Sequence, residues 1–178
     1  IKCNPDVLFP EREQMSMEKV FLKDYVGEIV RTCHRRNIHA MGGMSAFIPS
    51  AGADITNTVR RDKELEIQLG CDGAWVAHPA MIEQVQSLFR SAFNGAPHQK
   101  HRCGVAPKTP RIFLSETGAQ TARSLEQSVH ASLFYLHAWL QGHGAVAYAG
   151  KMEDLATFEI AAHQLKNWIQ HKAMLDTG

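Results

Sequence analysis

The feature that most constrains this chain is an alternation of helical stripes with short apolar runs between residues 20 and 93. A first helix is predicted by apolar residues that recur on one helical face, namely Leu22, Val26, Ile29, Val30 and Cys33. The short apolar run at residues 38–41 then leads into Gly42 and Gly43. This run predicts a buried parallel strand, with the two glycines in the loop that follows it.

The same order is repeated further along the chain. Residues 54–70 predict a solvated helix that ends at Gly70, and residues 74–77 predict a second short strand before His78 and Pro79. A further helical face is formed by Ile82, Val85, Leu88, Phe89 and Phe93. Helices that alternate with short strands are typical of parallel α/β architecture.

The pattern changes after Phe93. Residues 94–110 are rich in Gly, Pro and basic side chains, and they predict a linker between two domains. Beyond the linker a long helix is predicted by Leu125, Val129, Leu133, Leu136 and Leu140. We expect Trp139 to pack in the core with Leu136 and Leu140.

Charge and composition exclude several classes of partner. The chain has 178 residues, a net charge of +1, and basic side chains scattered among acidic ones, so no nucleic-acid surface is predicted. No apolar run approaches the ~20 residues that span a bilayer, so we expect no membrane partner. The four cysteines are far apart and form no C-x-x-C pair, which indicates reduced thiols and no structural zinc site.

Asp154 is the candidate functional residue. Residues 143–150 are small, apolar and bounded by glycine, which suits a strand or a close loop, and a helical face follows at Phe158, Ala161, Ala162, Leu165, Trp168 and Ile169. Asp154 is therefore predicted at a helix N-terminus, where a negative charge is favoured. It is either an N-cap or a carboxylate base. The adjacent Glu153 is expected to point elsewhere.

Several strings of residues, taken together and in order, resemble the malate synthase family, specifically the A-type enzymes of the glyoxylate cycle. Residues 32–36 read TCHRR and residues 39–49 read HAMGGMSAFIP. The next blocks are DKE at 62–64 and DGAWVAHP at 72–79. The last two are YLHAWLQGHG at 135–144 and MEDLATFEI at 152–160.

This resemblance implies an α/β fold, in which the C-terminal part of a (β/α)₈ TIM barrel is followed by an α-helical C-terminal domain. Residues 1–94 would be the last β/α units of the barrel, residues 95–115 a linker, and residues 116–178 the helical domain. We expect the chain to be a piece of a longer protein, because it begins at Ile1 without Met and neither end carries a clear signal. Peroxisome or glyoxysome and cytoplasm both stay open as its compartment.

The function implied by the resemblance is the condensation of acetyl-CoA with glyoxylate, with Mg²⁺ as cofactor and thioester hydrolysis to malate and CoA. The family's catalytic aspartate falls on Asp154. The substrate and CoA side of the barrel mouth would be lined by Gly42, Gly43, Met44, Trp75 and Pro79. No metal ligand is expected in this segment. The alternative is an inactive relative that binds CoA or has a structural role.

Overall fold

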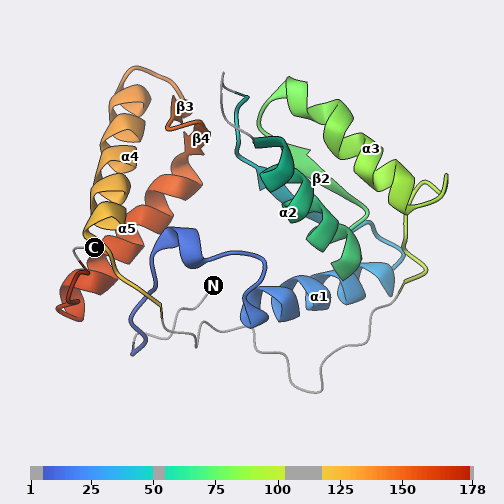
Figure 1. Cartoon of the computed structure of the whole chain (residues 1–178), viewed down its shortest axis with the longest axis horizontal. Coiled ribbons are helices and arrows are strands. Elements are labelled where there is room, and N and C mark those ends of the chain that lie inside the picture. Colours follow the sequence, from blue (N-terminus) through green and yellow to red (C-terminus); the bar gives the residue numbers. More distant parts are fainter. Residues whose placement is uncertain (1–5, 50–54, 103–117, 177–178) are drawn as a thin grey trace. The chain divides into compact units, whose positions relative to one another are not determined.

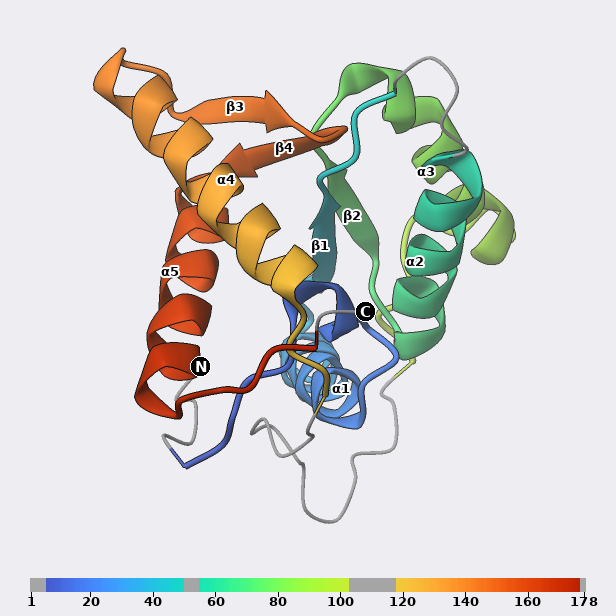
Figure 2. The same cartoon turned by 60° about the vertical axis from the view of Figure 1, so that its left-hand side comes forward.

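The elements predicted between residues 20 and 93 are present in the computed structural model, which describes residues 6–49, 55–102 and 118–176. In chain order they are α1 (Val20–His34), β1 (Met41–Ser45), α2 (Ile55–Leu69), β2 (Gly73–Val76) and α3 (Ile82–Ala92). A short 3-10 helix, η2 (Pro79–Met81), leads into α3. Strands β1 and β2 pair in parallel (Figure 2), which confirms the predicted parallel α/β order in this part of the chain.

The described residues fall into two compact units. Residues 17–102 form one, which we call the β/α unit, and residues 6–16 with 118–176 form the other, which we call the helical unit. This grouping differs from the division predicted from sequence, because residues 6–16 pack with the C-terminal elements. Residues 95–102 also belong to the β/α unit, since Gln99 is buried there and its side chain donates to the carbonyl oxygens of Ile67 and Cys71.

The core of the β/α unit lies between its helices and the two strands. One cluster joins α2, η2 and α3 through Val59, Ile67, Met81, Val85 and Phe89. A second cluster joins α1 to the residues just before the strands through Val30, Ala40 and Cys71. Burial raises the pKa of the Cys71 thiol to about 12, with further contributions from the charges of Glu66 and Asp72, so this cysteine is a protonated core residue.

The prediction that the first strand is buried and ends before the glycines is wrong. Gly42 and Gly43 lie inside β1, and Met41 and Met44 are about half exposed. The register of β1 against β2 is irregular between Met41 and Met44. Side chains of α2 bind the backbone of Gly43 at this step, which holds the glycine segment beside the helix.

Asp72 ties together the segments that precede both strands. Its carboxylate accepts hydrogen bonds from the backbone N–H groups of Ala40, at 2.9 Å, and Gln99, at 2.8 Å. It also lies 2.9 Å from Nε2 of the buried His34. The other ring nitrogen of His34 lies 2.9 Å from the carbonyl oxygen of Arg102, so both ring nitrogens of this buried side chain have a partner.

The helical unit contains η1 (Arg12–Gln14), α4 (Ala122–Leu140), β3 (Ala145–Tyr148), β4 (Lys151–Asp154) and α5 (Leu155–Gln170). The long helix α4 and the strand β3 confirm the predictions for these residues. Strand β4 was not predicted, because residues 151–154 were interpreted as the N-terminus of a helix. They pair antiparallel with β3 through a two-residue turn, Ala149 and Gly150, and both turn residues have positive φ as a type I′ hairpin requires.

The prediction that Trp139 is packed core is also wrong for this unit. Trp139 is 57% exposed, and its expected partners Leu136 and Leu140 are 37% and 76% exposed. Helix α4 instead buries a face of mostly small side chains, made by Ser124, Ser128, Ala131, Tyr135 and Ala138. Small residues allow α5 to lie close beside α4 (Figure 1), and Tyr135 contacts Phe158 of α5 at 5.7 Å between ring centroids.

No helix in the described ranges is long and apolar enough to cross a membrane.

The pH dependence of the β/α unit gives a test of the Asp72 network. Burial alone would raise the pKa of Asp72, but the N–H groups of Ala40 and Gln99, together with His34, outweigh it and hold the pKa below the usual 3.8. Because the pKa is lowered in the folded state, ionised Asp72 stabilises the unit above about pH 4. This contribution to stability is lost as the pH falls further and the carboxylate becomes protonated.

We expect Asp72→Asn to lower the protection of α1 and α2 amides against hydrogen exchange at pH 7. Below pH 4 the protection of the variant should fall less steeply with pH than that of the wild type. Glu64→Gln, on the exposed side of α2, is the matched control and should behave as wild type. If amide protection in Asp72→Asn depends on pH as in the wild type, the Asp72 network is not the source of the acid sensitivity.

Candidate functional site

Asp154 is the last residue of β4 and the N-cap of α5. It has extended backbone angles, and its Oδ1 accepts a hydrogen bond from the backbone N–H of Thr157 at 3.1 Å. The Thr157 hydroxyl donates to the same oxygen at 3.4 Å. The predicted capping role is therefore confirmed.

The capping contacts leave the second carboxylate oxygen of Asp154 without a partner. Among the described residues no donor hydrogen-bonds to Oδ2, and the side chain is partly exposed. The carboxylate is thus oriented through Oδ1, while Oδ2 accepts no hydrogen bond from the described residues. Such an arrangement can act as a general base toward a bound substrate.

Glu153 faces the opposite way from Asp154, because successive side chains alternate across a strand. It is 3% exposed, and its carboxylate pairs with the guanidinium group of Arg12. The expectation that Glu153 points away from the Asp154 side is confirmed. Sequence patterns gave no indication of Arg12, which lies 141 positions earlier in the chain.

The structure brings several of the other candidate residues together in the β/α unit. Gly42, Gly43 and Met44 lie in β1, where Met44 is the register partner of Trp75 in β2. Both side chains are largely exposed, Met44 by 47% and Trp75 by 62%. Pro79 begins η2 just after β2 and is exposed as well. Four of the five predicted loop residues therefore lie in strands, and Trp75 is not a core residue in this unit.

Two buried charges of α2 hold the glycine segment of β1. The Lys63 ammonium donates to the carbonyl oxygen of Gly43 at 2.8 Å and to both oxygens of Glu66 at 3.1 Å. Glu66 accepts the backbone N–H of Gly43 at 2.8 Å. Burial raises the pKa of Glu66 although Lys63 acts to lower it. Both backbone groups of Gly43 are therefore bound by α2 side chains at the irregular step of the strand.

Gly42 is required by this arrangement. A Cβ atom at Gly42 would overlap the Glu66 carboxylate and lie 2.5 Å from its Cδ. At Gly43 the nearest atom, Glu66 Oε1, would be 3.4 Å from a Cβ, which is an ordinary contact. The first glycine thus permits the close approach of Glu66 to the strand, and its role in the structure is local packing.

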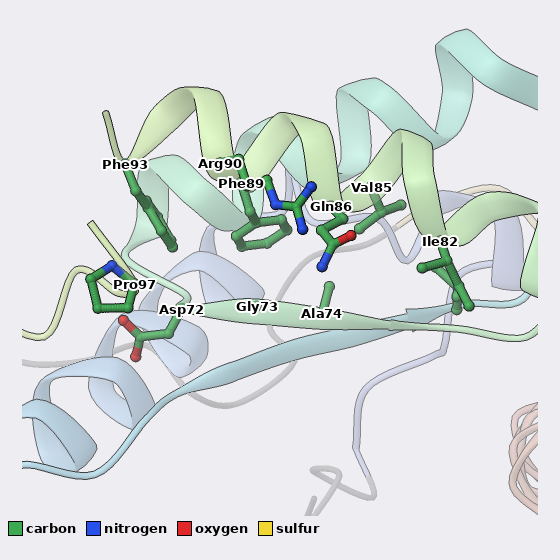
Figure 3. A pocket seen from close by; sticks show the side chains of 11 residues that line it. Asp72, Gly73, Ala74, Ile82, Val85, Gln86, Phe89, Arg90, Phe93 and Pro97 are labelled. Atoms are coloured by element: carbon green, nitrogen blue, oxygen red, sulfur yellow. The ribbon is translucent and has the colours of Figure 1, made fainter. Parts of the chain in front are cut away.

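A cavity of about 430 Å³ lies between β2 and α3, within the β/α unit (Figure 3). Its walls are mostly apolar, and its polar side chains are Asp72, Gln86 and Arg90. Because the oxygens of Asp72 already bind Ala40, Gln99 and His34, the cavity presents no unengaged carboxylate from the described residues. It therefore does not supply a second candidate for acid–base chemistry.

The described parts of the chain contain no group of three or more His, Cys, Asp or Glu side chains that could hold a metal ion. Asp154 and Glu153 do not converge, because they point to opposite faces of β4. Within residues 6–49, 55–102 and 118–176, no cluster of acidic side chains is therefore available for a magnesium site.

Comparison with known proteins decides the family. A family model described as malate synthase, TIM barrel domain, matches residues 1–111, and one described as malate synthase, C-terminal, matches residues 119–178. The chain belongs to the malate synthase family. Among solved structures, a citrate lyase from Burkholderia xenovorans LB400 is 17% identical to this chain, with a TM-score of 0.36. The match covers 97% of this chain and 42% of that one.

Individual malate synthases match the whole chain. The malate synthase of Myxococcus xanthus is 40% identical over 100% of this chain and 34% of its own length. That of Oryza sativa subsp. japonica is 36% identical over 99% of this chain and 33% of its own, and malate synthase A of Escherichia coli is 35% identical over 100% and 35%. The chain therefore spans about a third of the length of these malate synthases.

Substitution of Gly42 tests the contact between α2 and β1. Gly42→Ala forces a methyl group against the buried Glu66 carboxylate, so we expect a loss of about 1–3 kcal/mol in the free energy of opening of β1 and α2, measured by hydrogen exchange.

Gly27→Ala is the matched control. A Cβ at Gly27 meets nothing within 4 Å, and the residue lies inside α1, so alanine should stabilise that helix by about 0.5–1 kcal/mol. Equal effects of the two substitutions would rule out the steric argument.

Proposed function

We propose that the protein containing this chain condenses acetyl-CoA with glyoxylate and hydrolyses the resulting thioester to malate and CoA, with Asp154 as the catalytic acid/base. The single observation that carries the role of Asp154 is its geometry, because Oδ1 is fixed by the helix α5 and Oδ2 accepts no hydrogen bond from the described part of the chain. The names of the similar proteins support the reaction.

In the proposed first step, Asp154 takes a proton from the methyl group of acetyl-CoA. A thioester methyl is a very weak carbon acid, so the base must be held in position against it and the resulting enolate must be stabilised. The enolate carbon then forms a bond to the aldehyde carbon of glyoxylate, whose oxygen takes up a proton. Water cleaves the thioester and releases CoA as the leaving thiol.

The proposal includes the domain arrangement that the family resemblance implies. Residues 1–94 would supply the last β/α units of a TIM barrel, residues 95–115 a linker, and residues 116–178 the domain that carries Asp154. The parallel pair β1–β2, separated by α2, is compatible with consecutive barrel units. Residues 6–16 would belong to the barrel sequence while packing on the helical unit.

The remaining site residues are assigned as regions. Gly42, Gly43, Met44, Trp75 and Pro79 would line the substrate and CoA side of the barrel mouth, and the exposed Met44–Trp75 pair offers an apolar surface for such contact. The family's divalent metal, Mg²⁺, would be bound by acidic residues outside this segment, as would the arginine that stabilises the enolate. An inactive relative is not favoured, because the similar proteins from Oryza sativa, Myxococcus xanthus and Escherichia coli are all named malate synthases.

Replacement of Asp154 tests the proposal in the complete protein. Asp154→Asn keeps the size and the capping oxygen but removes the proton acceptor, so glyoxylate-dependent release of CoA should fall at least ~10²-fold. Folding should be nearly unchanged, because asparagine caps a helix about as well as aspartate, and circular dichroism checks this.

Glu159→Gln is the matched control, because Glu159 is exposed on α5 and its side chain takes no part in the cap. It should retain wild-type turnover. Near-wild-type CoA release in Asp154→Asn would exclude Asp154 as the base and leave it with its capping role.

A further inference from the structure

The residue before the candidate base is a buried carboxylate. Glu153 is 3% exposed, whereas the side chain of Asp154 is partly exposed on the other face of β4. An ionised carboxylate loses several kcal/mol of hydration when it is buried, so it is retained only where a partner replaces the water. The proposed mechanism gives Glu153 no task, and its burial therefore requires another explanation.

Arg12 supplies the partner through two hydrogen bonds. Its two terminal nitrogens reach the two oxygens of Glu153 at 3.3 Å and 3.1 Å. A planar guanidinium that binds both oxygens fixes the carboxylate in direction as well as in position, which a single ammonium group does not do. The pair therefore restrains the orientation of β4 at the residue next to Asp154.

Arg12 is itself held in place by the segment that carries it, residues 7–14. The backbone of Phe9 exchanges hydrogen bonds with α5, because its N–H donates to Asn167 at 2.9 Å and its carbonyl accepts from the indole of Trp168 at 2.7 Å. Asn167 and Gln164 also donate to the carbonyls of Val7 and Pro10, both at 3.1 Å. The segment, blue beside the red helix α5 in Figure 1, is thus fixed along the helix that Asp154 caps.

A second set of contacts fixes the same segment to the start of α4. The N–H of Glu11 donates to the carbonyl of Ala119 at 2.9 Å, and the hydroxyl of Thr121 donates to the Glu11 carboxylate at 2.7 Å. Thr121 is the N-cap of α4. The position of Arg12 is therefore determined by both helices of the unit.

We propose that Arg12 is a positioning residue for the reaction and acts through Glu153 on the direction of the Asp154 carboxylate. This inference rests on the proposed role of Asp154 as the base. Thr157 restrains Asp154 from the helix side, and the Arg12–Glu153 pair restrains it from the strand side. Proton abstraction from a methyl group needs this restraint, because a displacement of about 1 Å can cost ~10²-fold in rate.

The test is Arg12→Lys in the complete protein. Lysine keeps the positive charge beside the buried Glu153 but contacts it through one nitrogen, so the orientation is loosened while the charge pair remains. We expect kcat for glyoxylate-dependent CoA release to fall at least about tenfold, with KM for acetyl-CoA within about twofold, because only the geometry of the chemical step is changed. Rates are expressed per folded molecule, measured by circular dichroism, so that a loss of stability does not enter kcat.

Arg123→Lys is the matched control, since Arg123 is an exposed arginine of α4 in the same unit. It should leave kcat and KM unchanged. The variants Arg12→Met and Glu153→Gln add a coupling measurement, because two residues that act as one unit should give a double variant no slower than the slower single variant.

The outcomes separate the two proposals. An unchanged kcat in Arg12→Lys, or an effect confined to KM, overturns the positioning role, as do additive effects of Arg12→Met and Glu153→Gln. Asp154→Asn is assayed alongside. If Asp154→Asn is inactive while Arg12→Lys is fully active, the base assignment stands and the positioning inference fails. If Asp154→Asn is active, the base assignment itself fails.

Discussion

The cost of removing a carboxylate from water constrains both units of this structure. The side chains of Asp72, Glu66 and Glu153 are all buried, and each accepts at least one hydrogen bond from a different segment of the chain. Each carboxylate therefore fixes the backbone around its partners. Glu66 fixes the glycine step of β1, Asp72 the starts of both strands, and Glu153 the segment that carries Arg12. The geometry of these segments depends more on the buried charges than on local sequence preference.

This dependence explains which parts of the fold the sequence predicted. The five α-helices of the described residues and the strands β1 and β2 were predicted with the right type and order, because periodicity and glycine positions are local signals. The end of β1 was predicted too early, because Gly42 and Gly43 read locally as a turn. The backbone groups of Gly43 are bound by Lys63 and Glu66, which lie 20 and 23 positions further on, and no local pattern contains that information.

The buried face of a helix was harder to predict than the helix itself. In α4 the large apolar side chains suggested one face, whereas the helix packs against α5 through small residues such as Ser128 and Ala131. Strand β4 was missed for a related reason, since its composition is polar and its pairing with β3 depends on the turn at Ala149 and Gly150. At the candidate site, Asp154 and its cap were predicted, but Arg12 was not, because the pair spans 141 positions.

Capping and catalysis are often treated as competing explanations for an aspartate at the start of a helix, yet here the geometry makes them compatible. A cap needs one oxygen and a base needs another, and Asp154 has Oδ1 on Thr157 and Oδ2 without a partner from the described residues. The helix N-terminus also favours the negative charge that a base requires. Because the cap lies at the end of a strand, the adjacent carboxylate is directed to the opposite face, where it can be buried and paired. Under the proposed mechanism, the alternation of β4 thus separates two neighbouring acids, since Glu153 can anchor the strand without occupying the space that Oδ2 faces.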